Sequence, residues 1–157
     1  MDAIDRRILN ELQSEGRQTN AHLAEVLGLS SSATHDRVRR LEREGMIRAY
    51  RADVAPEAMG VGLQAFIAAE LNAHNRGFIE GFERGILQVR GVRACYHITG
   101  RFDYLVHVAV QDLERLGALI KTDIAGIPGV SKIETMLVLT EVQADAGWPP
   151  VETDDLD

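Results

Sequence analysis

Apolar residues recur at helical spacing in three short segments of the first fifty residues. One segment follows Asp2, the second spans residues 20–27, and the third spans residues 31–44. The link Gly28-Leu29-Ser30 between the last two is the short glycine-containing turn of a helix-turn-helix, and its serine is a favoured helix N-cap. The pattern therefore predicts a helix-turn-helix at the start of the chain.

The third segment has one apolar face and one basic face. Thr34, Val38 and Leu41 fall at positions i, i+4 and i+7 and are expected to face the core. The opposite face suits a recognition helix in the major groove, where serine and histidine reach base edges and arginines bind phosphate or guanine. The residues predicted to contact DNA are Ser31, Ser32, His35, Asp36, Arg37, Arg39, Arg40, Arg43 and Arg48.

Two members of this set have alternative roles. Asp36 is out of place on a surface that meets phosphate, so it either accepts a hydrogen bond from cytosine N4 or orients Arg40 four residues later. Arg37 flanks the core face of the segment, which leaves both a structural ion pair and a DNA contact open for it.

A short strand is expected after the third helix. Residues 46–52 alternate apolar and polar side chains, which predicts a wing-like extension that holds Arg48 near the DNA backbone. Pro56 and Gly60 then mark a hinge into the second half of the chain.

The second half alternates strand and helix patterns in the order βαββαβ, which is that of the α+β ferredoxin-like fold. Strands are expected at 63–71, 93–99, 104–110 and 133–142, and helices at 76–88 and 112–125. The predicted organisation is a winged helix-turn-helix over 1–52, a hinge over 53–60, a ferredoxin-like domain over 61–142 and an acidic, flexible tail over 143–157.

The predicted strands are apolar on both faces, most clearly in Met136-Leu137-Val138-Leu139 and in Leu105-Val106. Two helices can cover only one face of a four-stranded sheet. The other face needs a partner, and a second copy of the same sheet is the simplest one, because exposed apolar surface of that size favours aggregation. This argument predicts a homodimer. Separately from it, we also expect higher oligomers such as an octamer.

Charge is divided unevenly along the chain, whose formal net charge is −7. Residues 1–52 carry a net charge of +1 and residues 53–157 a net charge of −8. Within the first part, residues 37–51 hold six arginines against two glutamates. This asymmetry fits a surface that meets double-stranded DNA, although a solvated helix face with ion pairs gives the same pattern.

The composition, 45% hydrophobic and 26% charged, is that of an ordinary globular protein. No apolar run approaches the ~18–20 residues that span a bilayer, and the charged N-terminus has no signal-peptide core. The single cysteine, Cys95, fits a reducing compartment. We expect a cytoplasmic protein with no membrane partner.

Several motifs occur together in one order. In the first half they are Asp5-Arg6-Arg7-Ile8-Leu9, Gly28-Leu29-Ser30-Ser31-Ser32 and the run from Arg37 to Ile47. In the second half they are Cys95 to Leu105, with its Gly-x-x-Asp-Tyr segment, and Ile127-Pro128-Gly129-Val130. Across residues 1–142 the chain resembles the Lrp/AsnC transcriptional regulators. It departs from that pattern at Thr34 and His22, where the family usually has an apolar residue and often an acidic one.

The resemblance implies a sequence-specific DNA-binding regulator whose assembly and DNA binding respond to an amino acid or related metabolite, held near the loop 100–104. Gly100 permits close backbone approach, and Asp103 can pair with an α-ammonium group. Alternatively, both residues only form the hairpin turn. The predicted effector-binding residues are Gly100, Arg101, Phe102, Asp103, Tyr104, Thr135 and Leu137.

Other chemistry has weaker support. Cys95 and His97 share one face of a predicted strand, with His107 on the next strand, but no second cysteine or HxxxH motif accompanies them. We expect no metal, no cofactor and no catalytic residue. The alternatives to an effector-responsive regulator are a sirohaem-decarboxylase-like enzyme on the same two-domain fold and a DNA-architectural protein that ignores small molecules.

Two features have no firm account in the sequence. Gly77, Gly81 and Gly85 recur every four residues in the predicted helix, which suits close packing against another subunit or reflects a weak helix. In the tail, Trp148 is an apolar side chain that can dock on a neighbouring subunit.

Overall fold

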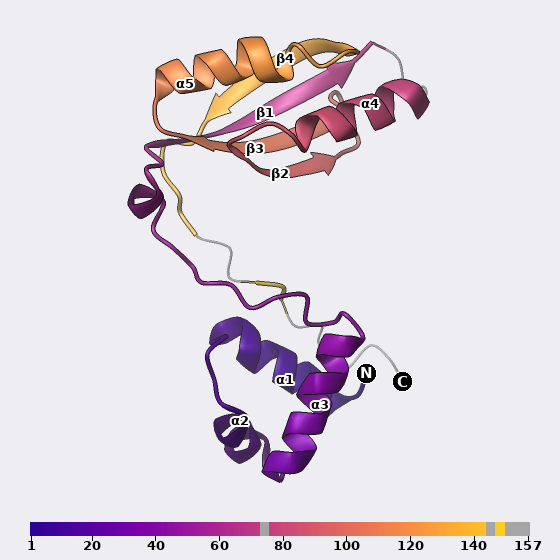
Figure 1. Cartoon of the computed structure of the whole chain (residues 1–157), viewed down its shortest axis with the longest axis vertical. Coiled ribbons are helices and arrows are strands. Elements are labelled where there is room, and N and C mark those ends of the chain that lie inside the picture. Colours follow the sequence, from indigo (N-terminus) through magenta and orange to yellow (C-terminus); the bar gives the residue numbers. More distant parts are fainter. Residues whose placement is uncertain (73–75, 144–146, 150–157) are drawn as a thin grey trace. The chain divides into compact units, whose positions relative to one another are not determined.

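The structure is a computed structural model that describes residues 1–72, 76–143 and 147–149. It divides into two compact units, which are Met1–Asp53 with Val142–Asp157 (unit 1) and Val54–Glu141 (unit 2). Three helices make up most of unit 1, and unit 2 is a sheet with helices (Figure 1). No helix among the described residues is long and apolar enough to cross a membrane.

The helices of unit 1 are α1 (Ala3–Ser14), α2 (Asn20–Leu27) and α3 (Ser31–Arg43). Each begins at a side-chain cap, since the side chains of Asp2, Thr19 and Ser30 accept backbone N–H groups of the first turn. Gly28 ends α2 with a φ of +69°, the left-handed conformation that glycine adopts without strain. The predicted helix-turn-helix is confirmed.

The core of unit 1 lies among the three helices and contains Ile8, Leu23, Leu27, Val38 and Leu41. Thr34, which stands where the resemblance suggests an apolar residue, is also buried. Its hydroxyl donates to the carbonyl of Ser30 at 3.1 Å, so this polar group is buried with a partner.

The strand predicted at 46–52 does not form. The N–H groups of Met46 and Ile47 both donate to the carbonyl of Leu41, at 2.9 and 3.1 Å, and the Ile47 side chain packs on the core of unit 1. A strand needs a partner for its ladder, and every strand among the described residues belongs to unit 2. The expected hinge contains a short 3-10 helix, Pro56–Met59.

Unit 2 contains the predicted βαββαβ order. Its elements are β1 (Leu63–Leu71), α4 (Arg76–Ile86), β2 (Val92–His97), β3 (Tyr104–Val110), α5 (Leu113–Ala118), the π-helical segment η2 (Leu119–Ile124) and β4 (Val130–Leu137). The strands lie in the order β2-β3-β1-β4, and each neighbouring pair is antiparallel. This is the ferredoxin-like arrangement that the sequence predicts.

The last strand differs most from its prediction. It begins at Val130 rather than residue 133 and ends at Leu137 rather than residue 142. Its pairing with β1 runs from Leu71 to Ala65, with an irregularity at Glu70/Leu71 that extends the ladder to Val130. The boundaries therefore follow the available partner strand rather than the apolar run.

The core of unit 2 lies between the sheet and the helices. Alternate residues of β1 and β3 pack against side chains of α4, α5 and η2, which include Phe82, Ile86, Leu116, Leu119 and Ile124. Gly85 allows α4 to approach a neighbouring segment, because a Cβ there would lie 3.1 Å from Ile127 Cγ2. A Cβ at Gly81 would meet open space, so within the chain only Gly85 of these two lies in close packing.

Candidate functional sites

The outward face of α3 is the candidate DNA-binding surface. Ser31, Ser32, His35, Asp36, Arg39 and Arg43 are exposed on it, and Arg48 is exposed beyond its end. The Ser30 cap leaves the serines in the first helical turn, where a recognition helix presents its N-terminal residues. His35 Nδ1 lies 3.0 Å from Asn20 Nδ2 of α2, a contact that orients the ring.

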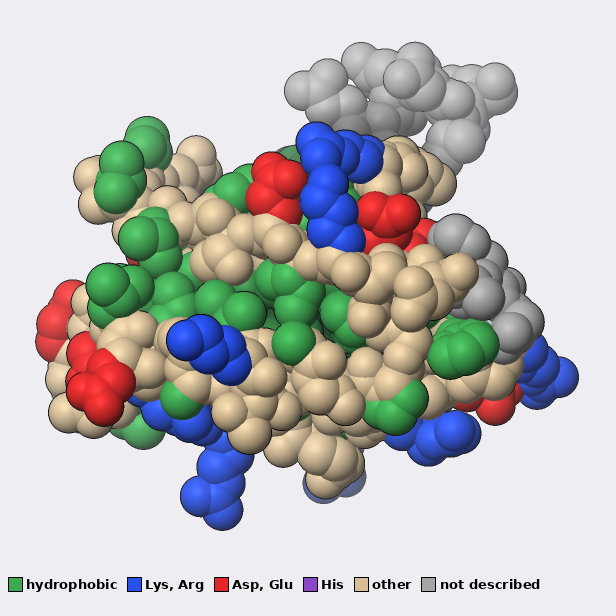
Figure 2. Space-filling view, turned by 90° about the horizontal axis from the view of Figure 1, so that it is seen from above, with side chains coloured by type: hydrophobic (Ala, Val, Ile, Leu, Met, Phe, Trp, Pro, Cys, Tyr) green, Lys and Arg blue, Asp and Glu red, His purple; other side chains and the backbone are tan. Residues whose placement is uncertain are grey.

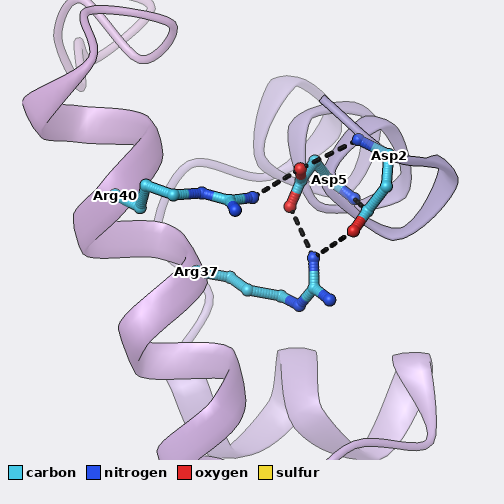
Figure 3. Close-up of polar contacts among 4 residues, drawn as sticks. All are labelled: Asp2, Asp5, Arg37 and Arg40. Carbon is cyan, nitrogen blue, oxygen red and sulfur yellow. Dashed lines mark hydrogen bonds and ion pairs between the residues drawn. The ribbon is translucent and has the colours of Figure 1, made fainter.

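A buried carboxylate binds two other arginines of the predicted set. Asp5 on α1 is only 1% exposed, and its oxygens lie 2.8 Å from Arg37 Nη1 and 2.5 Å from Arg40 Nη2 (Figure 3). Arg37 also donates to Asp2 Oδ2 at 2.7 Å. Within α1, Asp2 and Asp5 form a reciprocal capping box, each accepting the other's backbone N–H. These four side chains, Asp2, Asp5, Arg37 and Arg40, form a charged cluster. The cluster therefore holds the start of α1 against the middle of α3.

The pKa values of both carboxyls reflect this cluster. The hydrogen bond from Arg37 is the main cause that lowers the pKa of Asp2 to about 2. Burial acts to raise the pKa of Asp5, but the backbone hydrogen bond from Asp2 and the bond from Arg37 outweigh it, and the pKa is lowered. The charged carboxylates are therefore the forms that the fold binds.

The cluster separates the predicted DNA-binding arginines into two kinds. Arg37 and Arg40 are partly buried and paired with α1, whereas Arg39 and Arg43 are exposed and have no ion pair within the described residues. The structure pairs Arg40 with Asp5 rather than with Asp36. The sequence carried a signal for Asp5, which is a carboxylate beside Ile4 and Ile8 on a face predicted to be buried.

The effector loop predicted at 100–104 is the connection between β2 and β3. Gly100 has a φ of +124°, and a Cβ there would meet open space. Asp103 Oδ2 accepts the N–H of Leu71 at 2.8 Å, and the Asp103 backbone bonds to Ala69 and Ile98. Asp103 thus fixes the loop to the end of β1.

Two cations lie against the ring of Phe102 in this loop. The Arg101 guanidinium is 5.1 Å and Lys132 Nζ of β4 is 5.7 Å from the ring centroid, within cation–π range. Arg101 also lies 3.8 Å from Glu134. Sequence reasoning missed Lys132 and Glu134, because only the pairing of β4 with β1 brings them beside the loop.

The other predicted effector residues differ in exposure. Tyr104 is buried, and its hydroxyl donates to Glu83 at 3.0 Å. Burial is the main cause that raises the pKa of Tyr104, and the hydrogen bond to Glu83 raises it further. Thr135 and Leu137 lie on β4, an edge strand, and both are exposed. The structure thus offers loop and edge-strand side chains to solvent and keeps Tyr104 in the core.

The sheet face opposite the helices lacks cover within the described residues. It presents Phe66, Tyr96, Leu105, His107 and Met136, of which Tyr96 and Met136 are 55% and 44% exposed. The rings of Phe66 and His107 stack at 4.7 Å, and His107 Nε2 lies 2.9 Å from Gln64 Oε1. Burial is the main cause that lowers the pKa of His107, and the charge of Arg93 lowers it further. The lowered pKa favours the neutral ring.

Apolar side chains also reach the surface away from this face. Leu87, directly after α4, and Leu113, the first residue of α5, are 77% and 63% exposed. Figure 2 shows hydrophobic side chains exposed across the middle of one face of the molecule, with most charged side chains nearer its margin. Apolar surface is therefore plentiful, and the open sheet face is the part that forms a regular array.

The described residues contain no group of three or more His, Cys, Asp or Glu side chains able to hold a metal. Burial, with Glu83 nearby, raises the pKa of the Cys95 thiol. A raised pKa favours the thiol over the nucleophilic thiolate. The arrangement of Cys95, His97 and His107 therefore gives no support to nucleophilic chemistry.

Comparisons with known proteins match both halves of the chain. The Lrp/AsnC ligand binding domain matches residues 64–148, and a winged helix-turn-helix DNA-binding model matches residues 1–48. The leucine-responsive regulatory protein of Escherichia coli strain K12 is 36% identical over 143 residues, which cover 91% of this chain and 87% of that protein.

Solved structures give the same result. The complex of a transcriptional regulator from Neisseria meningitidis with L-methionine superposes with a TM-score of 0.88 at 31% identity, covering 95% of this chain and 96% of that one. AsnC of E. coli has a TM-score of 0.82 at 26% identity, covering 92% and 95% of the two chains.

The first prediction concerns Asp5. Asp5→Asn should destabilise unit 1 by about 1–3 kcal/mol, because Arg37 and Arg40 lose the charge they share while water can still reach both. Urea unfolding followed by circular dichroism measures the change. Asp36→Asn, which removes an exposed carboxylate from the same helix pair, is the matched control and should have little effect. Equal stabilities of the two variants would contradict a structural role for the cluster.

The second prediction concerns acid. A carboxyl whose pKa is lowered in the folded state stabilises it above the unfolded pKa, and that stability is lost as pH falls through the folded pKa. For the pKa of Asp2 this interval runs from its ordinary value of 3.8 down to about 2. The melting temperature of unit 1 should therefore fall over this range, and less steeply in Asp5→Asn. Parallel pH profiles for wild type and variant would refute the assignment.

Proposed function

The chain belongs to the Lrp/AsnC family of DNA-binding transcriptional regulators, and from this membership we propose that an amino acid or related metabolite controls its assembly and DNA binding. Support for the effector comes from the match to the Lrp/AsnC ligand binding domain and from the neighbouring structure that holds L-methionine. A DNA-binding protein of this kind would act in the cytoplasm.

The observation that carries the DNA-binding role is the exposed polar face of α3 beside the paired arginines. We assign Arg39 and Arg43 to phosphate or guanine contacts, and Ser31, Ser32 and His35 to base edges at the helix N-terminus. Arg48 is a further backbone contact and Asp36 a base contact. We assign Arg37 and Arg40 mainly to holding α3 on α1, because Asp5 already pairs with both.

We place the effector at the loop 100–104 and the adjoining part of β4. Gly100 leaves the backbone open to a ligand, and Arg101 supplies a cation for an α-carboxylate. Phe102 provides further contact surface, and Asp103 and Tyr104 keep the loop in shape through Leu71 and Glu83. Thr135 and Leu137 pair with Ile67 and Ala65, farther along the sheet from the loop, and would complete the site from another subunit. An effector here would bear on β4 through Lys132 and Glu134, which lie beside Phe102 and Arg101.

We propose that a second copy of the chain covers the open sheet face. Phe66, Leu105 and Met136 would pack across a two-fold axis, where the same surface meets itself. Such a dimer can present two α3 helices to successive major grooves, ~34 Å apart. Higher oligomers such as an octamer would then form from dimers, and an effector held between subunits would shift their population.

The enzyme alternative has less support. The matched relatives are regulators, and the arginine face of α3 serves DNA rather than a small substrate. We therefore propose a regulator without catalytic activity, cofactor or metal. A DNA-architectural protein indifferent to small molecules is the outcome that a negative effector screen would favour.

The third prediction tests the DNA surface. Arg39→Ala and Arg43→Ala should each weaken DNA binding, and a lost phosphate contact should lower the slope of log K against log[salt] by about 0.9. Fluorescence anisotropy titrations at several salt concentrations measure both quantities. A variant that loses about 1–3 kcal/mol at one base pair instead would mark base readout.

Two further arginines separate the possible causes. Arg40→Ala should lower the free energy of unfolding of unit 1 and leave the salt slope nearly unchanged, because its guanidinium is paired with Asp5. Arg76→Ala, an exposed arginine of unit 2, should change neither. If Arg39→Ala and Arg43→Ala behaved like Arg76→Ala, the α3 surface would not be the DNA-binding site.

The fourth prediction tests the effector. In a thermal-shift panel of amino acids that includes L-leucine and L-methionine, at least one compound should raise the melting temperature. It should also change the dissociation constant for DNA by about 5- to 150-fold. Arg101→Ala should weaken this response and Arg84→Ala, at an exposed helix position, should not. A wild-type protein indifferent to the whole panel would contradict effector control.

The fifth prediction tests the dimer. Leu105→Glu places a charge in the middle of the open sheet face and should shift the protein toward monomers in sedimentation experiments. Leu87→Glu makes the same change at an exposed leucine near the end of α4 and should leave the assembly intact. An unaltered assembly in Leu105→Glu would move the interface elsewhere.

A further inference from the structure

The chain passes between its two units twice. It leaves unit 1 after Asp53 and returns to unit 1 at Val142 (Figure 1). The return follows β4, the strand that carries Thr135 and Leu137. Residues 144–146 lie outside the described residues, and the description resumes at 147–149. The sequence left the role of this tail open.

The returning segment is bonded to α1 by one side-chain amide. Gln13 Oε1 accepts the backbone N–H of Trp148 at 2.7 Å, and Gln13 Nε2 donates to the carbonyl of Trp148 at 3.2 Å. Both ends of the amide are used, so the side chain pairs with the tail backbone as a neighbouring strand would. The two residues are 135 positions apart in the sequence.

The residue before Trp148 suits this contact in two ways. Gly147 has a φ of +86°, in the left-handed region that favours glycine. A Cβ at this position would also lie 2.8 Å from Gln13 Oε1, closer than real Cβ contacts. Any other residue would therefore strain the backbone, and the Gln13 amide that holds the tail would have to shift to make room.

We propose that the segment after β4 is a second tether, docked on α1 through Gln13, which carries the effector's influence from β4 to the DNA-binding unit. Two domains joined by one linker are expected to move relative to each other. A second crossing of the chain between the same two units would restrict that movement. A change at β4 then alters the set of arrangements open to unit 1. The coupling step rests on the proposed effector site, and the docking step does not.

Trp148 is the only tryptophan of the chain and reports docking directly. Its side chain is 76% exposed, so the measured property should be mobility rather than burial. In time-resolved fluorescence anisotropy of the full chain, Gln13→Ala and Gly147→Ala should each increase the amplitude of fast local rotation. Ser14→Ala, which changes the next residue of α1, should match wild type. Equal decays in all four proteins would overturn docking.

The coupling step is tested with L-leucine and L-methionine as probes. The ratio of DNA dissociation constants with and without the probe should be about 5- to 150-fold in wild type and in Ser14→Ala. It should approach one in Gln13→Ala, while the amino-acid affinity measured by calorimetry stays unchanged. A Gln13→Ala protein that keeps the wild-type ratio would overturn the tether. A wild-type ratio of one with both probes would overturn the coupling step and the proposed effector response together, and the anisotropy result would still decide docking.

Discussion

The position of the recognition helix depends on one buried carboxylate that faces two arginines. An unpaired charge in the place of Asp5 would be costly to bury, so the helix pair is most stable where Arg37 and Arg40 both reach it. This requirement fixes the rotation of α3 about its axis. Because successive residues are turned by ~100°, Arg39 then points away from α1 while its neighbour Arg40 points toward it. Adjacent arginines thereby acquire opposite roles.

Much of this architecture follows from local sequence patterns, and the exceptions share a physical cause. Caps, the Gly28 turn and periodic apolar residues define α1, α2 and α3, and they lie within the chain segment they shape. The strand expected at 46–52 and the ends of β4 depend on whether a partner strand is present, which no local pattern records. The pairing of Arg40 with Asp5 and the approach of Lys132 to Phe102 are likewise long-range.

The candidate effector site shows the same division. Its loop was identified from a sequence resemblance, and the structure explains part of the motif without a ligand, since Asp103 accepts the N–H of Leu71. Tyr104 is held in the core by Glu83. The features that the proposed site would offer a ligand are the open backbone at Gly100, the cation of Arg101 and the exposed edge of β4. One sequence motif can thus combine residues that shape a loop with residues left free to contact a ligand.

The separation of the open sheet face from α3 has a genetic consequence. In the proposed dimer, a subunit defective in Arg39 or Arg43 would retain Phe66, Leu105 and Met136, and so could still join an intact subunit. Mixed dimers would then hold one competent helix, and a site that needs two would go unoccupied. Mutant alleles of the DNA surface would therefore act dominantly in cells that carry both copies, whereas alleles of the sheet face would be recessive.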